Sequence, residues 1–166
     1  QPFDSVMDTD VMIVIGANPT VAHPVFASQM KKRLRQGAKL IVIDPRETGL
    51  VRSAHIAAEH HIALSPGTNV PVVNALAYVI VSEGLVDEAY VKERCDPDSF
   101  EAWKAMILQP ANSPEVVAEI AGVDAETIRA AARLYGTAEN ASIYYGLGVT
   151  EHSQGSTMVM GMAKLA

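Results

Sequence analysis

Short runs of β-branched and aliphatic residues recur along the chain, and each run ends in a polar turn. Residues 11–15 read Val-Met-Ile-Val-Ile, and residues 40–43 read Leu-Ile-Val-Ile. Between them, Phe26, Met30 and Leu34 recur at a spacing of four, which is typical of one face of a helix. Strand, helix and strand in this order predict a βαβ unit with parallel strands.

The same alternation continues toward the carboxyl end of the chain. We expect further strands at 61–64 and 142–145, an apolar helix over 70–82 and a final helix from about 154. The region from about 87 to 136 has a helical pattern, with Ser113 and Asp124 as N-caps of short helices. The predicted fold class is therefore α/β. We expect a Rossmann-like, mostly parallel sheet with helices on both faces, plus a short-helix insertion at about 87–136.

Composition and charge narrow the class of protein. The chain has 166 residues, of which 49% are hydrophobic and 19% charged, which is typical of one globular domain. Its net charge of −6 disfavours a nucleic-acid partner, because phosphate neutralisation needs clustered cations. The longest apolar stretch, 70–81, contains Pro71 and Asn74, and it is too short to cross a bilayer. We therefore expect no membrane segment and, without a signal-peptide pattern, a cytoplasmic location.

The chain begins with Gln1 and stops at Ala166 within a helix-compatible segment. We therefore expect residues 1–166 to be one domain excised from a larger subunit. Cys95 is the sole cysteine, so we expect neither an intrachain disulfide nor a cysteine metal centre within this sequence.

A polar turn follows each of the four predicted strands. The turns are Gly16-Ala17-Asn18-Pro19, Asp44-Pro45-Arg46, 65–69 and 146–152. The carboxyl ends of parallel strands meet at one edge of a sheet, where open α/β folds bind their ligands. Glycines there let backbone N–H groups approach a phosphate. Asp44 can accept hydrogen bonds from ribose hydroxyls or a purine amino group, and Arg46 can contact phosphate or base.

The first turn also argues against one common class of ligand. Gly16-Ala17-Asn18-Pro19 does not match G-x-G-x-x-G, and Pro19 has no N–H to donate. A simple nicotinamide-binding Rossmann unit is therefore disfavoured.

These turns and their flanks resemble a known family in both order and spacing. The matching blocks are 10–19 with His23-Pro24, 37–46, 66–69 with Asn74-Ala75, and 146–155. They resemble the first nucleotide-binding segment of the molybdenum/tungsten bis-pterin oxidoreductases, the dimethyl sulfoxide reductase family. The resemblance is closest to the catalytic (alpha) subunits of formate dehydrogenases, and it covers essentially the whole chain.

The resemblance implies a molybdopterin guanine dinucleotide cofactor that carries Mo or W, bound along the strand-end turns. The implied cofactor contacts are Gly16, Asn18, His23, Asp44, Arg46, Gly67, Asn69, Gly148 and Glu151. The parent enzyme is expected to oxidise formate to CO2 and to pass electrons to other centres.

The family's metal ligand, its downstream arginine and its iron–sulfur cysteines match no part of this sequence. We therefore expect no catalytic or metal-binding residue here, and we expect the isolated chain to be inactive. The implied partners are the remainder of the catalytic subunit and electron-transfer subunits.

Several alternatives stay open on the sequence. Nitrate reductases and other members of the family would share the turns. A second class of function is an NAD-binding dehydrogenase domain. A third is an interaction module whose turns bind no ligand. His23 is either a residue of the helix cap or a cofactor contact. Glu151-His152 favours hydrogen bonding to a pterin over acid–base chemistry. His60-His61 disfavours a metal site, because neighbouring strand residues point to opposite faces.

Overall fold

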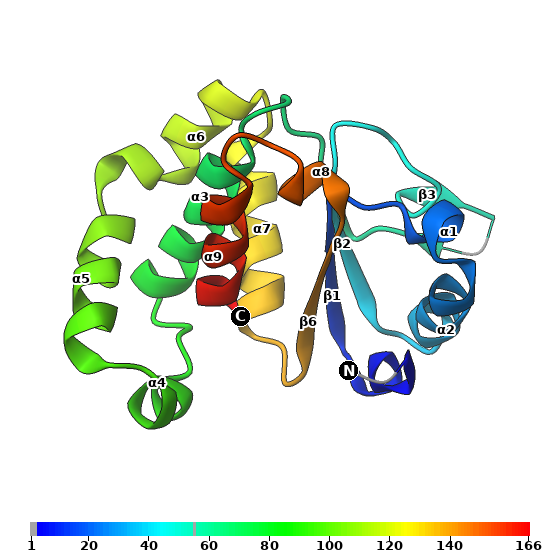
Figure 1. Cartoon of the computed structure of the whole chain (residues 1–166), viewed down its shortest axis with the longest axis horizontal. Coiled ribbons are helices and arrows are strands. Elements are labelled where there is room, and N and C mark those ends of the chain that lie inside the picture. Colours follow the sequence, from blue (N-terminus) through cyan, green and yellow to red (C-terminus); the bar gives the residue numbers. More distant parts are fainter. Residues whose placement is uncertain (1–2, 55) are drawn as a thin grey trace.

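Four parallel strands form the central sheet of the protein, whose computed structural model describes residues 3–54 and 56–166 (Figure 1). The strand β1 (Val11–Ile15) lies between β2 (Lys39–Ile43) and β6 (Ala141–Tyr145), and β5 (His60–Ile62) flanks β2. Each neighbouring pair is parallel, so the predicted α/β class is confirmed.

The strand β1 at the centre of the sheet is buried on both faces. Every residue of β1 is buried, and its side chains alternate between two apolar clusters. Ile13 and Ile15 belong to one cluster, while Met12 and Val14 belong to the other. This double burial explains the continuous apolar runs, which are typical of parallel strands covered by helices on both sides.

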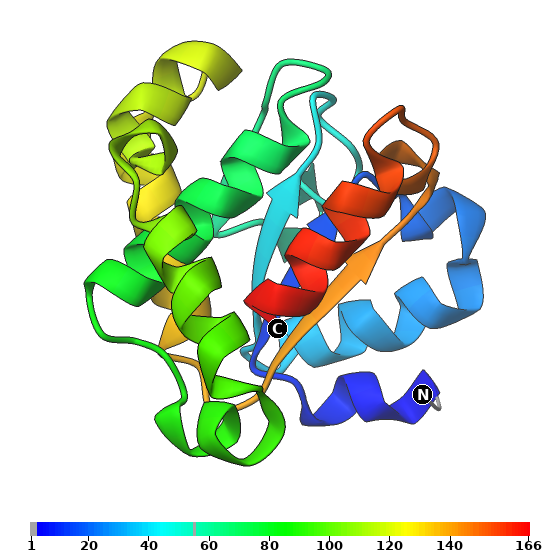
Figure 2. The same cartoon turned by 60° about the vertical axis from the view of Figure 1, so that its left-hand side comes forward.

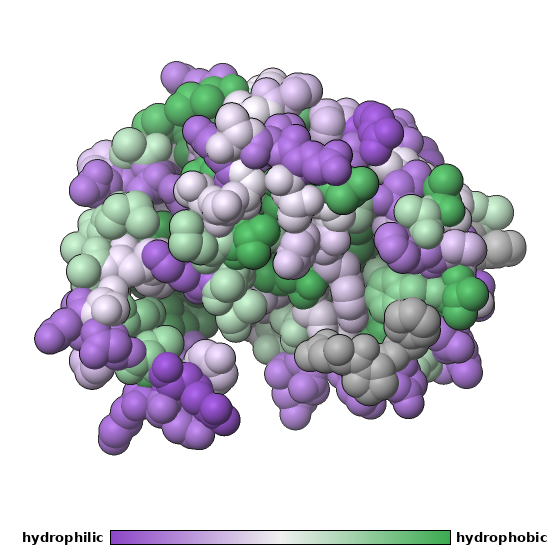
Figure 3. Space-filling view, viewed as in Figure 1, coloured by the Kyte–Doolittle hydropathy of each residue, from purple (hydrophilic) through white to green (hydrophobic). Residues whose placement is uncertain are grey.

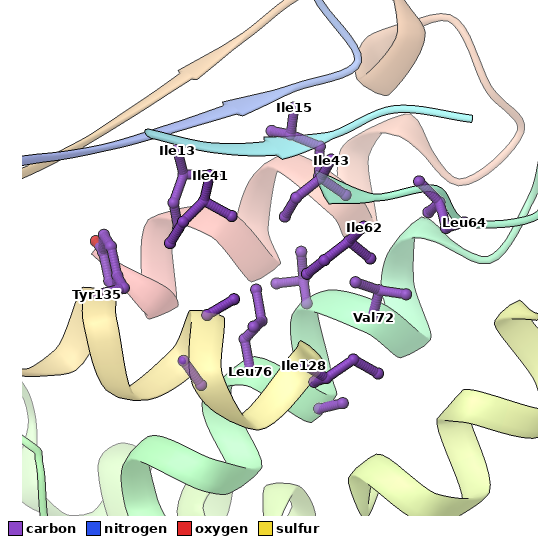
Figure 4. Packing of buried hydrophobic residues seen from close by; sticks show 14 of the residues in the cluster. Ile13, Ile15, Ile41, Ile43, Ile62, Leu64, Val72, Leu76, Ile128 and Tyr135 are labelled. Atoms are coloured by element: carbon purple, nitrogen blue, oxygen red, sulfur yellow. The ribbon is translucent and has the colours of Figure 1, made fainter. Parts of the chain in front are cut away.

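Three helices cover the first face of the sheet. They are α3 (Asn69–Ser82), α7 (Ala125–Gly136) and α9 (Gly155–Leu165). Figure 4 shows Ile13 and Ile41 of the sheet directed toward Leu76 of α3 and Ile128 of α7. All four of these side chains are at most 2% exposed, so this layer is a closed core.

The second face is covered by α2 (Pro24–Arg35) and the 3₁₀ helix η1 (Phe3–Asp8), and the single turn α1 (Pro19–Ala22) precedes α2 (Figure 2). Met30 is fully buried in this layer, and Phe26 and Leu34 are half-buried beside it, as the spacing of four predicts.

The short helices between 88 and 121 stand outside α3 (Figure 1). They are α4 (Glu88–Arg94), α5 (Pro97–Ile107), η2 (Pro110–Asn112) and α6 (Pro114–Ala121). Ser113 and Asp124 accept hydrogen bonds from backbone N–H groups three residues on, which confirms both as N-caps. The last helix of the predicted insertion, α7, belongs to the layer that covers the sheet, because Ile128 and Tyr135 pack in the main core.

Several short elements differ from the sequence-based expectation. The structure adds a two-stranded antiparallel ribbon, β3 (Arg52–Ser53) with β4 (Ile56–Ala57), and the single turn α8 (Leu147–Thr150). Strands of two residues and a single helical turn are too short to give a detectable periodicity. Among the described residues, no helix has the length and apolar character that crossing a membrane requires. His55, expected at the surface, lies outside the described residues.

Candidate functional site

The strand order places a crevice between the ends of β1 and β6. The strands β2 and β5 extend the sheet on one side of β1, and β6 lies on the other. Ligands of open α/β sheets bind where the order reverses in this way, outside the carboxyl ends of the strands. Gly16 follows β1 and Gly146 follows β6, so the first and fourth predicted turns flank this point.

The two turns touch through their backbones. The N–H of Gly148 donates to the carbonyl oxygen of Gly16 at 3.0 Å. A Cβ on Gly148 would lie 2.8 Å from that oxygen, and a Cβ on Gly16 would lie 2.7 Å from the carbonyl carbon of Gly148. Gly16 also has a φ of +55°, which favours glycine. Both glycines are therefore required by the close approach of the loops.

This contact changes which donors face the crevice. The N–H of Gly16 donates to Ile43 at 3.0 Å, and that of Gly148 is engaged as well. Any contact of these two glycines with a ligand must therefore use other atoms. The N–H groups of Ala17 and Asn18 donate to no other residue that the structure describes, and both residues line the cavity. These two N–H groups are the free backbone donors of the first turn.

A cavity of about 890 Å³ opens above these turns, within the range of cofactor sites. Eight of the nine predicted contacts line it: Gly16, Asn18, His23, Asp44, Arg46, Gly67, Asn69 and Gly148. Glu151 does not. It is the exposed C-cap of α8, and its neighbours Thr150 and His152 line the cavity instead.

Asp44 is the buried charge of this cavity. The residue is 3% exposed, and its Oδ1 accepts hydrogen bonds from Arg46, from the backbone N–H at 2.9 Å and from Nε at 3.3 Å. Its Oδ2 has no partner among residues 3–54 and 56–166. Asp44 lines the cavity, so this oxygen is available to a donor there. The side chain of Arg46 is 74% exposed, so its outer nitrogens are accessible to an anion.

Two histidines support the turns, and sequence reasoning missed both contacts. Nε2 of His61 lies 2.9 Å from the carbonyl oxygen of Asp44, and Nε2 of His152 lies 2.8 Å from that of Gly148. His61 and Asp44 are far apart in the sequence, so no local pattern could indicate the first contact. His23 is the N-cap of α2, but its side chain makes no capping hydrogen bond and lines the cavity.

An aromatic contact forms one wall of the cavity. Phe26 of α2 and Tyr144 of β6 have ring centroids 5.0 Å apart. Within the described part of the chain, no group of three or more His, Cys, Asp or Glu residues is arranged to hold a metal ion. The cavity thus combines apolar walls, a buried carboxylate, an accessible guanidinium and free N–H groups, which is chemistry suited to a nucleotide.

The fold and the cavity define an α/β protein with a parallel sheet and a cavity at its switch point. A family model described as "Molybdopterin oxidoreductase" matches residues 1–166, and the chain belongs to this family. The family implies a molybdopterin cofactor with Mo or W. Within it, the chain is similar to formate dehydrogenase alpha subunits, as the resemblance in the sequence predicted.

Two relatives show the extent of this similarity. Formate dehydrogenase H of Escherichia coli is 40% identical over 159 residues, covering 96% of this chain and 21% of the relative. The F420-dependent formate dehydrogenase 2 subunit alpha of Methanococcus maripaludis is 39% identical over 157 residues, covering 95% and 22%.

More distant members share the same segment. The periplasmic nitrate reductase of Desulfovibrio desulfuricans is 30% identical over 167 residues, covering 93% of this chain and 21% of the relative. Among solved structures, the acetylene hydratase of Pelobacter acetylenicus superposes with a TM-score of 0.82 at 27% identity, covering 95% of this chain and 21% of that one. The chain thus spans about a fifth of the length of the relatives that it matches.

Proposed function

We propose that residues 1–166 form one domain that holds a molybdopterin guanine dinucleotide in a molybdenum- or tungsten-dependent formate dehydrogenase. The observation that supports this most directly is the cavity at the β1/β6 switch point, which gathers side chains from all four strand-end turns. The family membership of the whole chain supports the choice of cofactor class.

The polar groups of the cavity fit a guanine nucleotide. Oδ2 of Asp44, which has no described partner, would accept from ribose hydroxyls or from the N–H groups of guanine. Arg46 would contact a phosphate or the base through its exposed guanidinium. The free N–H groups of Ala17 and Asn18 would bind a phosphate oxygen. Glu151 stays a predicted contact that a ligand would have to reach from outside the cavity.

The bound cofactor would supply the two-electron redox centre for formate oxidation to CO2. The residues of this chain would bind and orient its nucleotide portion, and they would exclude water from Asp44. We propose that the reacting side chains and an iron–sulfur cluster come from the rest of a catalytic subunit, which would associate with electron-transfer subunits. On this proposal the isolated chain is inactive, and the parent enzyme is cytoplasmic.

The choice of formate among the family's substrates rests on the order of similarity. Formate dehydrogenase subunits are 36–40% identical, whereas nitrate reductases are 27–30% identical over comparable spans. The dimethyl sulfoxide reductase DmsA of Escherichia coli is 34% identical but matches only 81% of this chain. These sequence identities favour formate as the substrate, and nitrate reduction is the alternative activity.

The test is a paired substitution in the subunit that contains this chain. Asp44→Ala combined with Arg46→Ala removes the free carboxylate and the guanidinium, each contact being worth about 1–3 kcal/mol. We expect the purified subunit to lose most of its metal and guanine dinucleotide, measured by elemental analysis and by release of GMP on acid hydrolysis. Glu47→Ala is the matched control, because Glu47 is exposed and outside the cavity lining. Unchanged cofactor content in the double variant would exclude the proposed site and would favour a non-binding module.

A second measurement separates this proposal from a nicotinamide-dependent dehydrogenase. Calorimetric titration of the protein with NAD and with GMP should show no micromolar affinity for NAD. Micromolar binding of NAD with no response to GMP would reject the molybdopterin assignment.

A further inference from the structure

His61 of β5 contacts the candidate cofactor site without lining its cavity. Its Nε2 lies 2.9 Å from the carbonyl oxygen of Asp44, and the residue is half-buried. In the register of β5 and β2, His61 pairs with Val42, while its neighbour His60 pairs with Ile41. Adjacent strand residues point to opposite faces, so the two histidines have different surroundings. Of the two, His61 is the one that donates to the turn after β2.

The carbonyl oxygen of Asp44 depends on this imidazole for its hydrogen bond. The ladder between β2 and β5 ends at the pair Ile43–Ile62, so it stops one residue before Asp44. No backbone N–H in the described chain donates to this oxygen. Among residues 3–54 and 56–166, Nε2 of His61 is therefore its one hydrogen-bond donor.

This hydrogen bond acts on the Asp44 carboxylate through the backbone of the turn. The carbonyl belongs to the planar peptide group between Asp44 and Pro45, and the ring of Pro45 fixes the next φ angle. The backbone N–H of Arg46 then donates to Oδ1 of Asp44 at 2.9 Å. Fixing the carbonyl therefore limits where this N–H can point. The same bond orients the carboxylate, whose Oδ2 has no described partner.

We propose that His61 is a positioning residue, which holds Asp44 in the orientation that binds the guanine nucleotide. This inference rests on the proposed function and deepens it, because it assigns a role at the same site to a residue outside the cavity lining. A carbonyl oxygen only accepts hydrogen bonds, so Nε2 of His61 carries a proton, in the neutral ring or in the imidazolium. A glutamine amide supplies the same kind of donor, whereas leucine has no donor.

The first test compares His61→Leu with His61→Gln in the subunit that contains this chain. The measured quantity is the rate at which the subunit loses its guanine dinucleotide on dilution, followed as GMP released by acid hydrolysis of the remaining protein. We expect a rate about five- to tenfold faster in His61→Leu, because the turn loses one hydrogen bond. The rate in His61→Gln should stay within about twofold of the unsubstituted subunit, because the donor is restored. An unchanged rate in His61→Leu, or equal rates in the two variants, would overturn the proposal.

A double-mutant cycle tests whether His61 acts through Asp44. Asp44→Asn alone changes the group that would contact the nucleotide, and His61→Leu is then added to it. If His61 only positions this side chain, its loss should change the rate by less than about twofold in the Asp44→Asn background. Independent contributions would instead multiply. Multiplied effects would show that His61 acts by another route and would reject the positioning role.

Two control variants change residues that do not contact the turn. His60→Leu is the matched control, because it removes the neighbouring imidazole on the opposite face of β5. Lys92→Gln changes an exposed residue of α4, on the hydrophilic surface at the lower left of Figure 3. Both should lose the dinucleotide at the unsubstituted rate. A His60→Leu rate as fast as that of His61→Leu would reject the assignment to His61.

Failure of this inference and failure of the proposed function give different results. If Asp44→Ala with Arg46→Ala keeps the dinucleotide, the nucleotide site itself is excluded. If that double variant loses the dinucleotide while His61→Leu keeps it at the unsubstituted rate, the site stands and the positioning role of His61 alone is excluded.

Discussion

The N–H of Gly148 donates to the carbonyl oxygen of Gly16 at 3.0 Å, which joins the turn after β6 to the turn after β1. The register of these strands brings Ile15 opposite Tyr145, so both turns leave the sheet at the same level. The hydrogen bond then fixes their separation, and with it one wall of the cavity. Because neither glycine has space for a Cβ, the sequence at both positions is constrained by the protein's own packing.

This contact predicts a large effect of Gly148→Ala on stability. The new methyl group would lie 2.8 Å from the carbonyl oxygen of Gly16, and a backbone oxygen cannot move aside without breaking the wall. We expect a loss of about 2 kcal/mol in the free energy of unfolding, seen as a fall of about 4–8 °C in the melting temperature. Gly49→Ala is the matched control, because its Cβ would meet its nearest neighbour, Oγ1 of Thr20, at 3.8 Å. Equal melting temperatures for the two variants would show that the turns do not need this contact.

The parallel sheet and both covering helical layers were predicted from the sequence because strands buried on both faces have a recognisable pattern. The strand runs at 11–15 and 40–43 are buried on both faces, and such strands have continuous apolar sequences. Capping residues such as Ser113 and Asp124 are local signals, and they placed helix starts correctly. The order β5-β2-β1-β6 follows from no local pattern, because it depends on which strands pair across long separations.

The sequence indicated most of the residues that share the cavity, but not the contacts among them, and their role as cofactor contacts stays a prediction. The turns are recognisable by composition, and eight of the nine predicted residues line one cavity. From the sequence alone, glycines in a strand-end turn were interpreted as positions where a phosphate approaches the backbone. In the structure, Gly16 and Gly148 approach each other, a tertiary contact that the composition of a single turn does not reveal. The support of Asp44 by His61 was missed for the same reason.

A second prediction concerns the buried hydroxyl of Thr48. This residue is 7% exposed, and its Oγ1 has no hydrogen-bond partner among the described residues. Thr48→Val replaces the hydroxyl by a methyl group of similar size, so we expect the free energy of unfolding to rise by about 1 kcal/mol. Thr9→Val should do the opposite, because Oγ1 of Thr9 lies 3.0 Å from Oγ of Ser142 and the change would leave that partner unsatisfied. Urea unfolding of both variants checks the pair, and a loss of stability in Thr48→Val would mean that its hydroxyl has a partner in solution.

The ion pair between Arg133 of α7 and Glu83 predicts a pH dependence of stability. Both guanidinium contacts to the Glu83 carboxylate measure 2.9 Å, and the hydrogen bond to Arg133 holds the pKa of Glu83 below its usual 4.5. A lowered folded-state pKa adds stability above the unfolded pKa, and this stability is lost as the pH falls through the folded value.

Arg133→Gln should therefore lower the melting temperature by a few degrees at most at pH 7, because the pair is exposed. The difference from the unsubstituted protein should shrink as the pH falls below about 4.5, and also in 1 M salt. Arg52→Gln, at an exposed arginine without a described ion pair, is the control and should show no such trend. A difference that grows on acidification would contradict the assignment.

The last prediction isolates the free oxygen of Asp44. In Asp44→Asn the side-chain carbonyl can still accept from the N–H of Arg46, so the turn keeps its hydrogen bond. The other oxygen, which has no described partner, becomes an amide that donates, and the charge is lost. We expect the subunit that contains this chain to bind its guanine dinucleotide about 10- to 100-fold more weakly, because hydrogen bonds to charged groups contribute about 1.5–3 kcal/mol.

The melting temperature without cofactor should change little, and Glu47→Gln should match the unsubstituted protein in both measurements. Full cofactor retention in Asp44→Asn would show that the nucleotide does not use this oxygen. A collapse of stability without cofactor would show instead that the carboxylate serves the fold.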